Sequence, residues 1–283
     1  MSPVITGIDH VAVAVRDLDD ARLAWERLGF TLSPRGRHIG RGTANYCAMF
    51  ERGYIELAGI VDPTAPVGGL AAFLARREGP RGLAFALPSL AAAVAALAAR
   101  GLHPGAPMDS IRQMELPEGT LMPRFRVAIL PSSETPGLSA FLCEHVTPAL
   151  SRRPDWLTHP NGAIGISSVT VLVAETAPLV SSYERLLGAG SVVATDAVVT
   201  AHCGPHRLVF AAQDDLAALI PQATPDPALA PPAIVALTLT SGDLDQTADH
   251  LTQWHVPHDE LPDGTILVPG REANGATLIF QRG

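Results

Sequence analysis

The sequence predicts an α+β fold made of four tandem βαβββ units, and three observations support this prediction. The order of strand, capped amphipathic helix and glycine recurs four times along the chain, although the fourth helix lacks the glycine. Short apolar runs lie between the recurrences and supply the strands that complete each sheet. The chain has 283 residues, of which 47% are hydrophobic and 17% charged, which is typical of a globular protein with two domains.

The strand and helix that open each unit occupy residues 11–29, 83–101, 169–188 and about 234–254. Each helix has apolar residues at helical spacing, and those of the first are Leu18, Ala21, Trp25 and Leu28. The later helices are expected to be capped by Ser89, then near Glu175 or Thr176, and then near Ser241. The completing strands are expected at 54–58, 124–129, 138–146, 207–211, 266–268 and 277–280.

The first strand of the first unit has one bulky face and one nearly bare face. Alternation puts three valines on one side, and on the other side Ile8, His10, Ala12 and Ala14. The valine face suits packing against a helix, and the bare face around His10 indicates a cavity. Glu56 stands inside an apolar strand, where a carboxylate is costly to bury unless it is paired, hydrogen bonded or metal-bound. His10 and Glu56 on two sparse faces therefore suggest a metal site.

The segments Ile8-Asp9-His10-Val11, Val15-Arg16-Asp17-Leu18, Leu28-Gly29-Phe30 and Tyr54-Ile55-Glu56-Leu57 resemble one known family. This is the vicinal oxygen chelate superfamily, which includes glyoxalases, extradiol dioxygenases and bleomycin-resistance proteins. Residues 36–45 (GRHIGRGTAN) and 143–163 are similar to one glyoxalase-like branch of it. The resemblance is most specific over the first unit and extends to about residue 163.

The resemblance implies two cup-shaped glyoxalase-like domains, each built from two units. The first domain would cover residues 1–147 and the second 163–283, with residues 148–162 as a connector and the proline-rich run 221–232 between units three and four. In the second domain Ser168 and Ile234 stand near the positions that match His10, and apolar residues match Glu56. We therefore expect a degenerate second cup that holds no metal and packs on the first.

The same resemblance implies a divalent metal in the first cup, bound by His10, Glu56 and one residue of the segment 143–146. Glu144 and His145 are adjacent and face opposite sides of a strand, so only one of them can point inward. The branch favours His145, with Glu144 as the alternative. Two histidines and one carboxylate suit Fe, Mn, Ni or Zn. Gly82 stands where the second unit would supply a further ligand, which leaves the set incomplete. Glu56 is the candidate general base if it is not a ligand.

The segment 36–45 is too polar and too rich in glycine to be part of a core. His38, Arg41, Thr43 and Asn45 suit a lip that grips an anionic or oxygen-rich substrate, and a solvated surface loop is the alternative. Arg124 and Arg126 project to one face of a later strand, and Arg126 is a further candidate for substrate binding.

Composition excludes several classes of protein. A net charge of −8 argues against a nucleic-acid surface, and three widely spaced cysteines give no disulfide framework. No apolar run approaches about 18 residues, and the N-terminus has no signal pattern, so we expect a cytoplasmic protein that is a monomer with an internal pseudo-dimer or a homodimer.

The sequence leaves two functions open. One is a metal-dependent lyase, isomerase or dioxygenase that acts on a small oxygen-rich substrate. The other is a metal-free protein that binds or sequesters a small molecule, as bleomycin-resistance proteins do.

Overall fold

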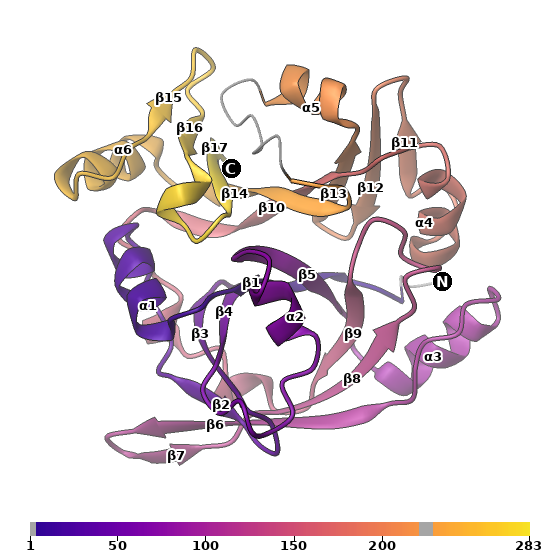
Figure 1. Cartoon of the computed structure of the whole chain (residues 1–283), viewed down its shortest axis with the longest axis horizontal. Coiled ribbons are helices and arrows are strands. Elements are labelled where there is room, and N and C mark those ends of the chain that lie inside the picture. The colour runs from indigo at the N-terminus through magenta and orange to yellow at the C-terminus, as the bar shows by residue number, and fades with distance from the viewer. Residues whose placement is uncertain (1–3, 221–228) are drawn as a thin grey trace.

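Two β-sheets pack against each other and form the framework of the molecule (Figure 1). The structure, a computed structural model, describes residues 4–220 and 229–283. Residues 221–228, which form most of the proline-rich run expected between units three and four, lie outside the described residues. Within those described residues, no helix is long and apolar enough to cross a membrane.

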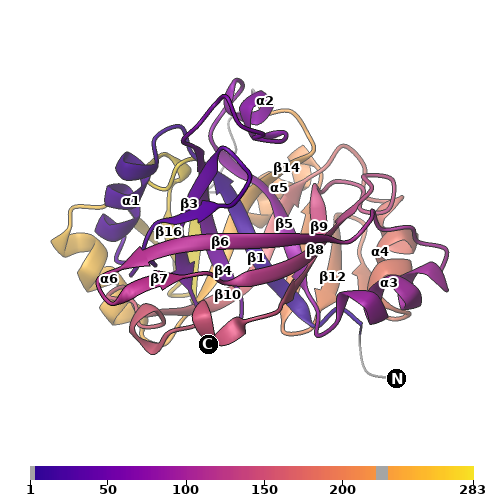
Figure 2. The same cartoon turned by 90° about the horizontal axis from the view of Figure 1, so that it is seen from below.

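The N-terminal sheet is closed into a barrel. Its strand order is β2-β3-β4-β1-β5-β9-β8-β6-β7, and β2 also pairs with β6, which closes the ring. Figure 1 shows β2 beside β6, and Figure 2 shows β6 lying across β1 and β4. The elements of this half are β1 (Gly7–Ala14), α1 (Leu18–Arg27), β2 (Gly36–His38), β3 (Thr43–Met49), β4 (Tyr54–Ile60), α2 (Leu70–Leu74), β5 (Gly79–Ala86), α3 (Leu90–Ala98), β6 (Met108–Leu116), β7 (Gly119–Leu121), β8 (Arg124–Leu130) and β9 (Ala140–His145).

The C-terminal sheet has eight strands in the order β11-β12-β13-β10-β14-β17-β16-β15. Two short 3-10 helices, η1 (Pro148–Leu150) and η2 (Pro154–Trp156), lead into it. Its elements are β10 (Ala163–Leu172), α4 (Leu179–Leu187), β11 (Val192–Ala194), β12 (Val198–Cys203), β13 (His206–Ala211), α5 (Gln213–Leu219), β14 (Ala233–Ser241), α6 (Leu244–Gln253), β15 (Asp259–Glu260), β16 (Ile266–Val268), η4 (Gly270–Glu272) and β17 (Thr277–Arg282).

The strand pairing shows the four predicted units. The first strands of two units lie side by side and antiparallel in each sheet, β1 with β5 and β10 with β14. Each first strand also runs parallel to the last strand of its own unit. Helices α2 and α5 are additions after the first and third units. The predicted α+β fold of tandem βαβββ units is confirmed.

Side-chain caps start three of the four long helices. Asp17 accepts hydrogen bonds from the backbone N–H groups of Asp19 and Asp20 at the start of α1, and Ser89 caps α3 as predicted. The cap predicted near Ser241 is Asp243, two residues further along the chain, and α6 begins at Leu244. The side-chain cap predicted near Glu175 or Thr176 is wrong, because α4 begins directly after Pro178 without a side-chain cap.

The valine face of β1 is buried between the two sheets. Val11 and Val13 are completely buried in one apolar core with Val169 and Val171 of β10. The first helix joins the same core through Trp25, whose Nε1 donates a hydrogen bond to Asn274 Oδ1 at 3.1 Å. The partner of the valine face is therefore the second sheet as well as a helix, and this shared core joins the two halves of the molecule.

The outer face of the C-terminal sheet is covered by α5. Leu216 and Ile220 are buried in an apolar cluster with Leu172, Val235 and Leu267 of the sheet. Figure 1 shows α5 on the side of this sheet that faces away from the N-terminal barrel. The face that corresponds to the inside of the first cup is thus filled with hydrocarbon side chains.

Two buried histidines form hydrogen bonds that hold the connector in place and join the two halves of the molecule. His159 accepts a hydrogen bond from Thr31 N at 3.0 Å through Nδ1 and donates from Nε2 to Met49 O at 2.9 Å. His206 Nδ1 accepts from Ile8 N at 3.0 Å, across the two sheets. Both roles need a neutral ring, because Nδ1 acts as an acceptor.

We expect the protein to lose stability as the pH falls from about 7 to about 4.5. Burial lowers the pKa of His159 and of His206 from 6.5 to about 4. Between these values the unfolded chain binds protons that the folded chain does not, so the free energy of unfolding falls with pH. Each histidine contributes at most about 3 kcal/mol.

Chemical denaturation at several pH values measures this dependence. A His159→Gln, His206→Gln double variant should show a shallower slope, whereas His202→Gln, at an exposed histidine of the same hairpin, should keep the wild-type slope. Equal stability of the wild-type protein at pH about 7 and about 5 would contradict the prediction.

Candidate functional site

A cavity of about 200 Å³ lies inside the N-terminal barrel, on the side of β1 opposite the valine core. Its lining includes six residues that the sequence placed in the site, namely His10, His38, Arg41, Thr43, Asn45 and Glu56. Residues outside those expectations also line it, among them Tyr54, Arg81, Arg112, Phe125, Phe141 and Cys143. The structure therefore brings the two central strands and the glycine-rich segment together around one space.

A β-bulge in β1 turns Asp9 toward the same side as His10. The pairing of β1 with β5 shifts register between Ile8 and His10, so strict alternation fails at this point. Ile8 is buried in the core between the sheets instead of lying beside His10, as alternation had predicted. Asp9, itself buried, accepts a hydrogen bond from His10 Nδ1 at 2.8 Å.

Asp9 holds a second histidine as well. His145 Nε2 lies 2.8 Å from Asp9 Oδ2. Burial acts to raise the pKa of Asp9, but the hydrogen bonds from His10 and His145 hold it well below its usual range. The carboxylate is therefore ionised, and it fixes His10 Nδ1 as the donor of this hydrogen bond. His10 Nε2 is then free to act toward the cavity.

Glu56 faces His10 across the floor of the cavity. Its Oε2 lies 3.6 Å from His10 Nε2, and its Oε1 lies 3.6 Å from His38 Nε2. Asn45 Nδ2 donates to Oε1 at 2.5 Å, and the His38 ring is held by Thr43 Oγ1 at 2.8 Å from Nδ1. Burial acts to raise the pKa of Glu56, but the neighbouring imidazoles and Asn45 hold it well below its usual range. Glu56 is thus a fixed carboxylate between two histidines.

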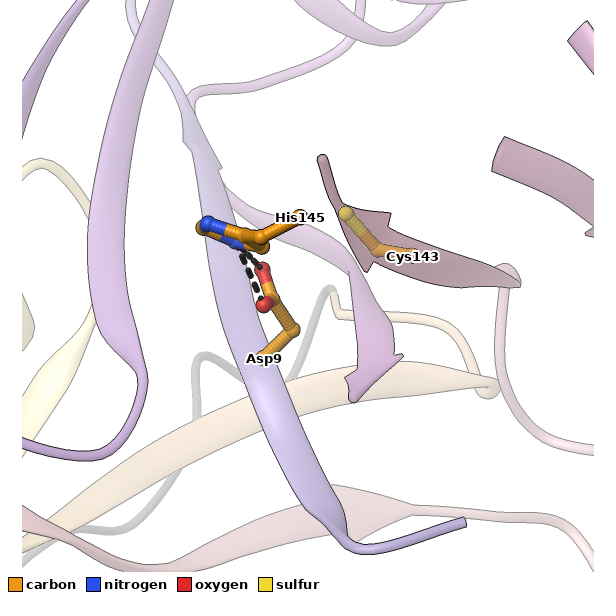
Figure 3. A group of neighbouring side chains, drawn as sticks. All are labelled: Asp9, Cys143 and His145. Carbon is orange, nitrogen blue, oxygen red and sulfur yellow. Dashed lines mark hydrogen bonds and ion pairs between the residues drawn. The ribbon is translucent and has the colours of Figure 1, made fainter. Parts of the chain in front are cut away.

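The two candidates at the end of β9 point in opposite directions. Glu144 Oε2 accepts a hydrogen bond from Leu90 N at 2.8 Å, at the start of α3, and so lies outside the cavity. His145 lies on the inner side with Asp9 and Cys143 (Figure 3). One donor atom from each of Asp9, Cys143 and His145 lies within 4.8 Å of the others, close enough to hold a metal ion. Both oxygens of Asp9 are already engaged by histidines, however.

The donors that face the cavity fit part of a metal site. His10 Nε2 and Glu56 Oε2, 3.6 Å apart, would hold a divalent ion between them. The carboxylate on the other ring nitrogen of His10 is the usual partner of a metal-binding histidine. His145 does not join this pair, because it is bonded to Asp9 behind it.

The second unit supplies no metal-binding side chain at the positions that match His10 and Glu56 of the first unit. A Cβ at Gly82 would collide with the carbonyl oxygen of Ser139, so no side chain fits there. In the first unit, Ala12 of β1 pairs with Glu56 of β4. The corresponding pair of the second unit is Ala84 of β5 with Phe141 of β9, so Phe141 stands where a second carboxylate would be. The site on the cavity side is therefore made of His10, Glu56 and His38.

Two arginines lie where the sequence analysis did not place them. Arg126, predicted to bind substrate, lies on the outer face of β8 and pairs with Asp109 at 3.6 Å, because Phe125 and Val127 take the inward positions. Arg112 of β6 lines the cavity instead and donates from Nη1 to Cys47 Sγ at 2.9 Å. Burial raises the pKa of the Cys47 thiol to about 11. The strand that carries Arg112 was not recognised in the sequence, since polar residues occupy both of its faces.

Structures of similar fold cover the whole chain. A hypothetical protein from Staphylococcus aureus matches with a TM-score of 0.69 and 11% identity, covering 98% of this chain and 99% of that one. A mutant of 4-hydroxymandelate synthase from Streptomyces coelicolor matches with a TM-score of 0.57 and 12% identity, covering 99% and 93%. A fusion of a xylose isomerase-like TIM barrel with 4-hydroxyphenylpyruvate dioxygenase matches with a TM-score of 0.55 and 15% identity, covering 100% of this chain and 50% of that one.

These identities are low, so the likenesses show the fold alone. No curated protein sequence matches the chain. The sequence model of the glyoxalase-like domain matches residues 8–187, which is more than half of the chain and includes the whole cavity. This match confirms the resemblance to the vicinal oxygen chelate superfamily that the first unit suggested. The chain therefore belongs to the glyoxalase-like domain family.

Proposed function

We propose that this protein is an enzyme that acts on a small, oxygen-rich substrate in the N-terminal cavity, with a divalent metal ion held by His10 and Glu56. The observation that carries the proposal is the facing pair of His10 Nε2 and Glu56 Oε2, 3.6 Å apart at the cavity floor, with Asp9 fixed behind the histidine. A metal in this position would act as a Lewis acid toward substrate oxygens. Fe, Mn, Ni and Zn all accept such donors.

The residues around this pair orient and protect it. Asp9 keeps the Nδ1 proton of His10 in place, and Asn45 holds the Glu56 carboxylate through Oε1. Tyr54 stacks on the His10 ring with centroids 4.5 Å apart, and Phe141 meets its edge. This aromatic packing prevents rotation of the ring and limits the access of water to it. His38 is the third donor on the cavity side, and His145 supports the site from behind through Asp9.

The size of the cavity restricts the substrate. A volume of about 200 Å³ is below the roughly 300–1,000 Å³ of drug-sized pockets, which favours a small substrate. Lyase, isomerase and dioxygenase chemistry all remain candidates. A thermal-shift screen of 1,2-dicarbonyl, catechol and 2-hydroxy acid compounds would select the substrate class on which to test them.

Metal analysis tests the proposal. We expect about one ion per chain in purified protein, or after incubation with Fe, Mn, Ni or Zn salts, and we expect this ion to be lost in His10→Ala. His103→Ala, at an exposed histidine of the same half, should keep the wild-type content. A wild-type protein that binds no metal even after reconstitution would overturn the proposal.

One observation favours a second candidate, a metal-free protein that binds or sequesters a small molecule. Gly82 and Phe141 occupy positions where a complete metal site would have donors. If this candidate is correct, small organic ligands will raise the melting temperature of metal-stripped and metal-treated protein equally.

We also propose that the C-terminal domain, residues 163–283, serves as a packing partner and binds no metal, with residues 148–162 as the connector. Leu216 of α5 and Ile220, which follows this helix, support this role, because they fill the face that would have to receive a ligand. A fragment of residues 1–161 should expose the shared core and associate or aggregate. A monomeric, soluble fragment would contradict the packing role.

A further inference from the structure

Arg112 is a buried cation without a carboxylate partner. Its side chain is 2% exposed and lies on β6 against the cavity. Nη1 donates to the sulfur of Cys47 at 2.9 Å, and Nε, which is also buried, has no hydrogen-bond partner. Among the described residues, no carboxylate lies within ion-pair distance of this guanidinium. A buried charge left in this state is costly unless something else neutralises it.

The charges of the residues that line the cavity also favour an anionic ligand. Three arginines line it, Arg41, Arg81 and Arg112, against the single carboxylate of Glu56. That carboxylate is already engaged by Asn45 and lies beside His10 and His38. The whole chain carries a net charge of −8, so the excess of positive charge is local to this cavity. A cavity of this kind attracts an anion.

Arg112 lies next to the proposed reaction site. A Cβ on Gly36 would collide both with Arg112 Cδ and with Asn45 Oδ1, so the arginine stem and the amide meet at the same glycine. The other end of that amide donates to Glu56. One small molecule in a space of about 200 Å³ can therefore touch Arg112 at one end and face Glu56 at the other.

We propose that the substrate is a small carboxylic acid whose carboxylate sits on Arg112, with its oxygen-bearing carbon directed toward His10 and Glu56. The planar guanidinium matches a carboxylate in geometry as well as in charge, which a lysine would not. The charge of this ligand supplies the counterion that the fold leaves out. The inference rests on the proposed function for the reaction that follows. The anion seat, by which we mean the guanidinium of Arg112 at the wall of the cavity, does not depend on any metal.

Calorimetric titration tests the anion seat directly. The probes are pyruvate, lactate and malonate, with pyruvamide and malonamide as neutral counterparts and inorganic phosphate as a different anion. We expect at least one carboxylate to bind and its amide not to bind. Arg112→Met should weaken that carboxylate roughly 30-fold or more, the usual effect of removing one partner of a buried charge pair.

Two further variants separate binding from folding. Arg112→Met should melt at or above the wild-type temperature, because it removes an unneutralised buried charge. Arg112→Lys keeps the charge and loses the planar fork, so we expect binding between those of wild type and Arg112→Met. The matched control is Arg126→Met, on the outer face of a neighbouring strand, which should bind as wild type does.

The outcomes also separate this inference from the proposed function. Carboxylate binding that survives in His10→Ala but fails in Arg112→Met supports the seat whether or not a metal is found. Carboxylate binding that needs His10 and not Arg112 would overturn the seat while leaving the metal proposal intact. Phosphate that binds through Arg112 more tightly than every carboxylate would overturn the substrate class, and so would amides that bind as well as the acids.

Discussion

Asp9→Asn is expected to lower the affinity of the cavity for a divalent ion by about 10- to 100-fold, the range seen when the partner behind a metal-binding histidine is removed. Asp9 carries the hydrogen bond that fixes His10 Nδ1 as a donor, and it also holds His145. An amide at this position would lose the charge that aligns both rings. Competition with a chelator of known affinity measures the change.

The control for this experiment is Glu144→Gln. Glu144 is a neighbouring carboxylate on β9, but it accepts a hydrogen bond from Leu90 N outside the cavity. Its replacement should cost some stability at the start of α3 and leave metal affinity unchanged. If Asp9→Asn binds metal as tightly as wild type, Asp9 does not orient His10 in the way that we propose.

Gly82→Ala is expected to destabilise the fold by about 3 kcal/mol, at the upper end of the range for overpacked sites. A Cβ at Gly82 would meet the backbone carbonyl of Ser139, which cannot rotate away as a flexible side chain could. For the same reason, placing a histidine at this position would not restore the missing ligand. Denaturant unfolding of Gly82→Ala measures the cost.

Gly165 provides the matched control. It lies in β10, the first strand of the third unit, and a Cβ there would meet no atom within 4 Å. Gly165→Ala should change stability by no more than about 1 kcal/mol. Equal stability of Gly82→Ala and wild type would mean that the second unit can accept a side chain at this position, and that the incomplete donor set does not follow from packing.

The fold was predictable because its signals repeat. Each unit opens with alternating apolar residues and continues into a helix with one apolar face, so four weak patterns support one another. His10 and Glu56 stood out as polar residues in otherwise apolar strands. The residues of the glycine-rich segment stood out by composition, and all four predicted there line the cavity.

The residues that sequence analysis missed depend on local irregularity and on contacts that are distant in the chain. Asp9 turns inward only because a bulge interrupts the alternation of β1. Arg112 lies on a strand with polar residues on both faces, which shows no period of two. Arg126 was assigned to the site by its charge, although its neighbours Phe125 and Val127 take the inward side. The orientation of Glu144 follows from a bond to Leu90, 54 residues away.

Substitution with Co(II) tests the central claim most directly, because its absorption spectrum reports which ligands bind the ion. We predict bands in the visible range that change in Glu56→Gln and in His10→Ala. We also predict no thiolate charge-transfer band in the near ultraviolet, since the sulfur of Cys143, although it lines the cavity, groups with Asp9 and His145 and not with His10 and Glu56. The contradicting result would be a thiolate band that disappears in Cys143→Ser, together with a spectrum that does not change in Glu56→Gln. That result would place the metal at Asp9, Cys143 and His145.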